Sequence, residues 1–171
     1  NGKPIYNAIV WQDRRTTEYC KILKKKKFEN LFRKKTGLFI DPYFSATKIK
    51  WILDNVKNSK KLIKSNNLLF GTIDTFLIWK LTRGQMHLTE TSNASRTMLF
   101  NIHSNKWDKE LLKKLKIPHE ILPKVKNSAD NFGVTSKKIV GKEIKISAVL
   151  GDQQSAAFGQ CCFHKGSIKS T

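Results

Sequence analysis

The chain has 171 residues, of which 39% are hydrophobic and 27% charged, a composition typical of a globular rather than a disordered protein. Its length suffices for one domain with a buried core, and no apolar run approaches the roughly 18 residues that a membrane-spanning helix needs. The formal net charge is +20, from 33 basic and 13 acidic residues. The first residues include no initiating Met and do not resemble a signal peptide, and the sequence stops as a polar segment begins, so we expect a piece of a longer protein.

The first part of the chain begins with a short apolar run and continues with an amphipathic segment. Residues 6–12 have the length and composition typical of a buried strand. Residues 13–36 repeat apolar side chains at helical spacing, with lysines on the other face, and Gly37 is a helix stop. The sequence therefore predicts a strand followed by helical structure.

The middle of the chain predicts two more helices with a strand between them. One helix follows the turn at 41–42 and carries an apolar face over 49–56. Residues 67–71 are another apolar run typical of a buried strand. The second helix covers 72–84, with Thr72 as its N-cap and a glycine at its end.

The next part predicts two strands around a polar loop. Residues 86–90 and 97–102 have strand composition, and the loop at 91–95 separates them. Asp108 is placed to cap a short helix, which Pro118 ends.

The last part of the chain predicts a loop-rich connection, a strand and a helix. Residues 121–135 form the connection. Residues 143–151 first alternate between polar and apolar side chains and then become wholly apolar. Residues 153–162 form a short helix with small residues facing the sheet. Because strands alternate with helices, the sequence favours an α/β fold with a largely parallel or mixed sheet.

The positive charge has two interpretations. One is a basic module that binds nucleic acid or another anionic surface, and phosphate contacts of that kind make affinity fall steeply with ionic strength. The other is a solvated, lysine-biased surface. We favour the second, because only five of the 33 basic residues are Arg and the lysines are scattered over the whole chain.

The three cysteines are Cys20, Cys161 and Cys162. Their odd number and the absence of a C-x-x-C spacing argue against a disulfide framework or a zinc site. We therefore expect buried, reduced thiols in a cytoplasmic protein, and no metal held directly by protein side chains.

The stretch AVLGDQQSAAFG, residues 148–159, places an acid and two amides directly after a predicted strand. In open α/β sheets ligands bind outside the carboxyl ends of strands, and Gly151 permits close approach. A carboxylate beside amides suits a polyol, whose hydroxyls both donate and accept. The simpler alternative is that Asp152 only caps the following helix.

Other polar and aromatic residues fall at predicted strand ends and turns. Trp11 ends the first predicted strand, and Tyr43 lies in a turn ahead of a helix. The polar loop carries Asn93, Ser95 and Arg96. Each has a structural alternative, since the aromatic rings can simply pack in a core and the arginine can pair with a surface acid.

Six segments spread over nearly the whole chain form a specific set. YFSATKIKWILDN, residues 43–55, has an aromatic, Ser, Lys, Trp, Asp and Asn at signature spacing. The other five, in chain order, are GKPIYNAIVWQDRRT, TGLFIDPYFS, LLFGTIDTFLIWKLT, SNASRTMLFNI and GDQQSAAFGQ. This set resembles the FGGY family of carbohydrate kinases, and within it the members that act on glycerol.

The resemblance implies a ribonuclease H-like, actin-like ATPase fold with two domains flanking a cleft. Residues 1–160 would be the later part of the first domain, and residues 161–171 the start of the second. The implied enzyme transfers a phosphoryl group from ATP, with Mg²⁺, to glycerol. It would work as a homo-oligomer in its full-length form, without nucleic acid as a partner.

The resemblance also assigns roles to four residues. Asp152 matches the catalytic acid, and Gln153 would contact glycerol beside it. Tyr43 matches a glycerol-binding tyrosine, and Trp11 matches the aromatic that packs on the carbon face of the polyol. Phosphoryl transfer needs positioning and charge stabilisation, so we assign Asp152 to orienting the hydroxyl first and to late proton acceptance second.

The family's ATP-binding loops would lie before and after these residues, so we assign no ATP-binding residue here and expect the 171 residues alone to be inactive. Residues 136–145 lack the Gly-Gly and Arg pattern with which some relatives bind a sugar bisphosphate inhibitor, so regulation of that kind is not expected. A related kinase acting on a pentulose or gluconate, and a nucleic-acid-binding module, are the alternatives.

Overall fold

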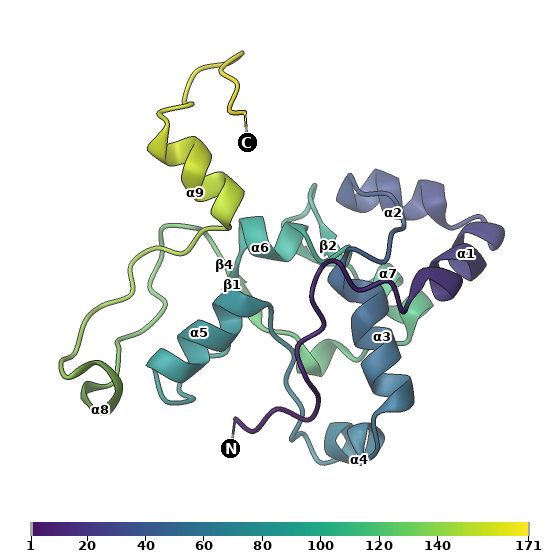
Figure 1. Ribbon diagram of the computed structural model, residues 1–171, viewed down its shortest axis with the longest axis horizontal. Helices are drawn as coiled ribbons and strands as arrows, with labels where there is room; N and C mark the ends of the chain where they lie inside the picture. Colours follow the sequence, from purple (N-terminus) through teal and green to yellow (C-terminus); the bar gives the residue numbers. More distant parts are fainter. Residues whose placement is uncertain (1, 171) are drawn as a thin grey trace.

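The computed structural model describes residues 2–170, and helices supply most of their regular structure (Figure 1). The α-helices are α1 (Thr17–Lys25), α2 (Glu29–Thr36), α3 (Ser45–Asn55), α4 (Ser59–Lys64), α5 (Ile73–Leu81), α6 (Thr91–Ser95), α7 (Lys109–Leu115), α8 (Lys137–Val140) and α9 (Asp152–Gly159). The 3₁₀ helix η1 (His119–Ile121) lies between α7 and the last strand. The strands are β1 (Leu88–Glu90), β2 (Phe100–Asn101), β3 (Lys106–Trp107) and β4 (Lys124–Lys126). The mixed α/β class predicted from the sequence is confirmed.

The main hydrophobic core lies among the helices of the first half, α7 and the antiparallel pair β2–β3. Its fully buried side chains come from distant parts of the chain: Phe32, Ile40, Met98, Leu99, Leu111 and Leu115. The helical pattern over 13–36 is interrupted, because Lys27 adopts a left-handed φ of 59° between α1 and α2. Gly37 ends α2 in the left-handed conformation with φ of 72°, as predicted.

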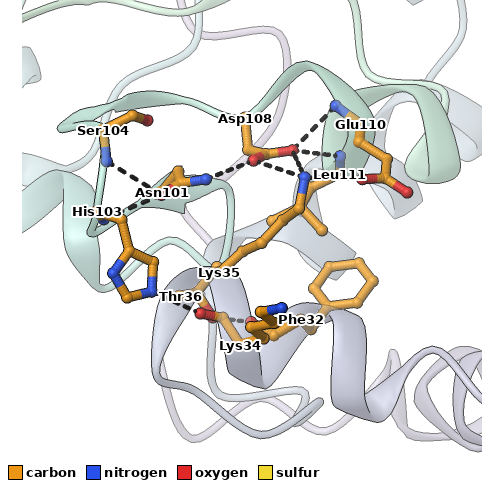
Figure 2. Close-up of polar contacts among 10 residues, drawn as sticks. All are labelled: Phe32, Lys34, Lys35, Thr36, Asn101, His103, Ser104, Asp108, Glu110 and Leu111. Carbon is orange, nitrogen blue, oxygen red and sulfur yellow. Dashed lines mark hydrogen bonds and ion pairs between the residues drawn. The ribbon is translucent and has the colours of Figure 1, made fainter.

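Asp108, predicted as a helix cap, joins three elements of this core region (Figure 2). Its carboxylate accepts the N–H groups of Glu110 at 2.9 Å and Leu111 at 3.0 Å, at the start of α7. It also accepts from Lys35 Nζ of α2 at 3.0 Å and from Asn101 Nδ2 of β2 at 2.8 Å. Burial opposes the charge, but these hydrogen bonds outweigh it and hold the pKa of Asp108 below its ordinary value.

A smaller region forms around α5, β1 and β4. The two strands pair in parallel, with Leu88 opposite Lys124, and α5 packs against β1. The buried side chains of this region are Ile78, Leu88 and Phe132. Thr72 stands at the N-cap of α5 as predicted, but its hydroxyl donates to the Asp74 carboxylate instead of accepting a helix N–H.

Two predicted strands of the first half are wrong, because residues 6–12 and 67–71 have no strand structure. A strand needs a partner that hydrogen-bonds along its length. Within residues 2–170 the second segment makes one main-chain bond of this kind, from Phe70 N to Ile121 O at 2.7 Å. The first is held by a side chain, because Lys48 Nζ donates to Val10 O at 2.6 Å.

The predicted strand at 143–151 is also wrong. These residues run antiparallel to residues 128–136 in an arm that α8 closes, and the arm stands to one side of the body (Figure 1). Isolated bridges join Ala129 to Ala148 and Val134 to Lys145. Apolar side chains along this arm remain exposed, so the segment lacks the sheet that its composition predicts.

The predicted polar loop at 91–95 is instead the helix α6. Glu90 is its N-cap and accepts the N–H groups of Ser92 and Asn93, both at 2.7 Å. Capping of these two donors makes a five-residue helix possible in a polar sequence. The flanking strands at 86–90 and 97–102 form as predicted, but only over the shorter spans of β1 and β2.

The predicted helix at 153–162 forms as α9. Its small residues were expected to pack against a sheet. No residue of α9 is buried by the described part of the chain, so residues 2–170 provide no sheet that covers this helix.

Candidate functional site

Trp11 and Tyr43, which lie 32 positions apart in the sequence, meet in the structure. Their ring centroids are 5.7 Å apart and their planes are inclined at 50°. Trp11 is 60% exposed and Tyr43 is 39% exposed, so neither ring lies in the core. Two exposed aromatic faces set at an angle can cover the carbon side of a small polyol.

The turn before α3 positions Tyr43. Asp41 Oδ1 accepts the N–H of Tyr43 at 2.8 Å, which fixes the turn predicted at 41–42. The Arg96 guanidinium carbon lies 5.5 Å from the ring centroid of Tyr43 and 5.2 Å from that of Phe44. Arg96 therefore faces aromatic rings, at a distance suited to a cation–π interaction, rather than a surface acid.

Lys48 of α3 holds both halves of the aromatic pair in place. Its Nζ donates to Val10 O at 2.6 Å, one residue before Trp11, and to Tyr43 O at 3.1 Å. Lys48 is only 6% exposed. Burial lowers its pKa, and the nearby carboxylate of Asp13 opposes that shift.

The residues after Trp11 are fixed by an ion pair. Arg15 donates to both carboxylate oxygens of Asp13, at 2.9 and 2.8 Å, and its guanidinium lies 4.5 Å from the Trp51 ring centroid. The hydrogen bonds from Arg15 lower the pKa of Asp13 to about 2. The carboxylate at position 13 is thus paired within its own turn.

Asp152 and Gln153 lie in the first turn of α9, and both are exposed. The N-cap of α9 is Gly151, so the alternative that Asp152 serves as the N-cap is wrong. Asp152 Oδ1 accepts the N–H of Gln153 at 2.7 Å, and Gln153 Oε1 accepts from Lys169 Nζ at 2.5 Å. The acid and the amide are therefore adjacent, on an element separate from the aromatic pair.

The helix α6 lies between these two parts of the site. At its start, Ser92 Oγ accepts the N–H of Gly151 at 2.8 Å, directly before Asp152. At its end, Arg96 faces Tyr43, and the carbonyl of Thr97 accepts the N–H of Ala46 in α3 at 2.9 Å. Figure 1 shows α6 between α9 and α3.

Sequence reasoning missed the roles of Lys48, Glu90 and Ser92. Lys48 is the lysine of the stretch at 43–55, but its pattern gives no sign of the carbonyls that it contacts. Glu is not among the residues that favour helix N-caps, so the sequence around Glu90 carries no capping signal that would predict α6. The candidates Asn93 and Ser95 bond within α6, to Glu90 and to the Ser92 carbonyl, so they support the helix.

The remaining features of the described residues bear on cofactors and location. No group of three or more His, Cys, Asp or Glu side chains in 2–170 is placed to hold a metal ion. Cys20 is buried as predicted, and burial raises the pKa of its thiol; Cys161 is exposed and Cys162 half-buried, contrary to prediction. Over the same range, the helices are too short or too polar to cross a membrane.

A hollow of about 490 Å³ lies between the loop after α5 and residues 134–143. Thr82, Arg83 and Lys137 are among its lining residues, and none of the four predicted site residues lines it. The predicted site residues therefore lie outside this hollow.

Comparison with known proteins identifies the family. The model of the FGGY family of carbohydrate kinases, N-terminal domain, matches residues 1–159. The chain belongs to this family. The FGGY assignment made from the six sequence segments is confirmed.

Individual FGGY relatives are similar over nearly the whole chain. A glycerol kinase of Thermoanaerobacter sp. (strain X514) is 59% identical over 170 residues, which are 99% of this chain and 34% of that protein. The crystal structure of Plasmodium falciparum glycerol kinase with ADP superposes with a TM-score of 0.92 and 39% identity, covering 97% of this chain and 33% of that one. A ligand-bound xylulose kinase from Lactobacillus acidophilus gives a TM-score of 0.73 at 27% identity, covering 90% and 31%. The chain thus spans about a third of the length of the relatives it matches.

Proposed function

We propose that the protein to which this chain belongs transfers the γ-phosphoryl group of ATP to glycerol, giving glycerol 3-phosphate and ADP. The observation that carries the proposal is the exposed Trp11–Tyr43 pair in a chain 59% identical to a glycerol kinase. Similarity to solved gluconate and xylulose kinases is lower, at 27% identity each. A larger sugar substrate is therefore the less supported choice.

The four site residues divide the work between binding and chemistry. Trp11 and Tyr43 cover the carbon backbone of glycerol, while the Tyr43 hydroxyl and the Gln153 amide bind its hydroxyl groups. Asp152 accepts a hydrogen bond from the reacting hydroxyl and aims its oxygen at the γ-phosphorus. As that O–P bond forms, the bond from the γ-phosphorus to the bridging oxygen breaks, ADP leaves, and the proton passes to Asp152.

The domain assignment is part of this proposal. Residues 1–160 belong to the later part of the first of two actin-like ATPase domains, and residues 161–171 begin the second. The exposure of every residue in the first turn of α9 supports a position for Asp152 at the groove between the domains. The exposed apolar side chains of the arm at 128–149 support its placement against further strands of the first domain.

The chain contributes little to the binding of ATP and Mg²⁺. Because residues 2–170 provide no group of metal-ligand side chains, they do not fit as a Mg²⁺ site, and we derive no step through the ion. We expect the phosphate-binding loops elsewhere in the full-length protein, so the 171 residues alone should be inactive. We also expect the full-length enzyme to be a homo-oligomer.

The experiment is the substitution Asp152→Asn in the full-length protein, with glycerol-dependent ADP release as the measurement. Asn keeps the size and the hydrogen-bonding capacity of the side chain but removes the proton acceptor. We expect kcat to fall by at least about 100-fold, the usual contribution of an acid–base residue. Gluconate and xylulose, tested in the same assay, distinguish the alternative substrates.

The matched control is Asp54→Asn, which removes an exposed carboxylate paired with Lys50 on α3. Its kcat should stay within about twofold of the unmodified enzyme, as for most surface substitutions. A near-normal rate for Asp152→Asn would contradict the catalytic assignment. An unmodified enzyme that releases ADP with xylulose but not with glycerol would contradict the substrate.

A further inference from the structure

Glu90 is a fully buried carboxylate with five hydrogen-bond donors around it. Its Oε2 accepts from Ser92 N at 2.7 Å and from Ser128 Oγ at 3.0 Å. Its Oε1 accepts from Asn93 N and Asn93 Nδ2, both at 2.7 Å, and from the Ser92 hydroxyl. These donors come from α6 and from the start of the arm, so one acceptor joins both segments to the end of β1.

The Ser92 hydroxyl extends this network to α9. Its single hydrogen is directed to Glu90, which leaves a lone pair free to accept the N–H of Gly151 at 2.8 Å. A Cβ at position 151 would lie 3.3 Å from Ser92 Oγ, so the glycine permits this close approach. The backbone of the residue directly before Asp152 is therefore held by a side chain 59 positions earlier.

The other end of α6 is joined to the aromatic pair. Arg96, the C-cap of α6, lies over Tyr43, and Thr97 O accepts the N–H of Ala46 at the start of α3. The five residues of α6 span about 7.5 Å at 1.5 Å per residue. One short, capped helix thus fixes the carboxylate-bearing turn at one end and the aromatic ring at the other.

We infer that Ser92, oriented by Glu90, is a positioning residue that sets the start of α9, and with it Asp152, relative to the Trp11–Tyr43 pair. This inference rests on the proposed function, because positioning matters for catalysis only if Asp152 meets a substrate held by the aromatic rings. Ser92 itself touches no reacting atom in this account. Its effect passes through the Gly151 N–H.

The test compares two serines of the same helix in the full-length protein. Ser92→Ala removes the acceptor of the Gly151 N–H, whereas Ser95→Ala removes a hydroxyl that, among residues 2–170, donates to the Ser92 carbonyl within α6. We expect Ser92→Ala to lower kcat with glycerol about 10- to 100-fold, the penalty of a small displacement of a catalytic group. The KM for ATP should stay within about twofold, and the KM for glycerol should rise by much less than kcat falls, because Gln153 shifts with the start of α9 while the aromatic pair is unchanged.

A conservative substitution that restores kcat separates a positioning role of Ser92 from a general loss of structure. Ser92→Thr keeps the hydroxyl and should restore kcat, whereas Ser95→Ala should leave it nearly unchanged. Equal losses for Ser92→Ala and Ser95→Ala, or a normal kcat for Ser92→Ala, would overturn the inference. So would a failure of Ser92→Thr to recover activity.

Hydrogen exchange gives a readout that does not depend on the reaction. The Gly151 amide should exchange slowly in the unmodified protein and in Ser92→Thr, and much faster in Ser92→Ala. Equal exchange rates would overturn the inference even if the enzyme is a glycerol kinase. Fast exchange in Ser92→Ala, in a protein that does not phosphorylate glycerol, would keep the structural link and refute only the proposed function.

Discussion

Two regions of the molecule are stabilised in different ways. The body is the region around α2, α3 and α7. The periphery consists of residues 6–12, the arm at 128–149 and α9. In the body, Phe32 and Leu111 are fully buried, and Asp108 ties α2, β2 and α7 together. In the periphery, several apolar side chains remain exposed, although Phe132 of the arm is buried against α5 and β1. Single polar contacts from Lys48 and Ser92 hold the backbone next to Trp11 and Asp152. The candidate site residues Trp11, Asp152 and Gln153 all lie in the periphery.

The comparison shows that burial stabilises the body, whereas a few hydrogen bonds position the site. Substitutions in the body should therefore change the free energy of unfolding. Substitutions at the links should change activity more than stability.

Removal of a core ring should have the largest effect. Phe32→Ala deletes a fully buried side chain and leaves a cavity, which should lower the free energy of unfolding by about 3–5 kcal/mol. Phe163→Ala is the control, because this ring is 60% exposed and should change stability by less than about 0.5 kcal/mol in the isolated chain. Urea denaturation of the purified chain measures both. Equal losses would mean that the periphery packs as tightly as the body.

Removal of the Asp108 charge should have the next largest effect, and it should depend on pH. Asp108→Asn cannot accept all the donors of α2, β2 and α7, so we expect a loss of about 1–3 kcal/mol at neutral pH. The folded pKa of Asp108 lies below its unfolded value. Its contribution is therefore present above about pH 4 and is lost as the pH falls through the folded value.

Thermal unfolding between pH 3 and 7 measures this dependence. The difference between the unmodified protein and Asp108→Asn should shrink as the pH falls below 4. Glu18→Gln, which changes an exposed i,i+3 ion pair on α1, should show no such trend. A constant difference across the range would argue against the charged carboxylate as the source of the stability.

The fold could be predicted from the sequence where an element depends on a local pattern of side chains. Amphipathic spacing predicted the helices of the body, and Asp108 predicted the cap of α7. The strand predicted at 6–12 finds no strand partner among residues 2–170, and residues 143–151 join 128–136 only through isolated bridges, so neither segment forms a strand. Local pattern thus predicts the propensity of a segment, not the presence of its partner.

The candidate site was predictable in its residues but not in its connections. The family resemblance and their residue types identify Trp11, Tyr43, Asp152 and Gln153 as candidates, and the structure brings the two aromatic rings together. The links through Lys48 and Ser92 were not predictable, because each joins a side chain to a main-chain group far away in the sequence. Main-chain acceptors and donors are the same at every position, so no residue pattern identifies them.

Lys48 is the link whose removal should have the smallest effect. Lys48→Met keeps the length and apolar stem of the side chain but loses the hydrogen bonds to Val10 O and Tyr43 O. The two rings then lose their common anchor, which should weaken glycerol binding by about 1.5 kcal/mol, or roughly tenfold in KM, in the full-length protein. The KM for ATP should not change, because neither ring is assigned to ATP.

Lys50→Met, on the same helix but paired with Asp54, is the control and should leave both constants unchanged. If Lys48→Met instead lowered kcat at constant KM, the aromatic pair would orient the reacting hydroxyl rather than bind glycerol. The assignment of binding to the rings and of chemistry to Asp152 would then be wrong.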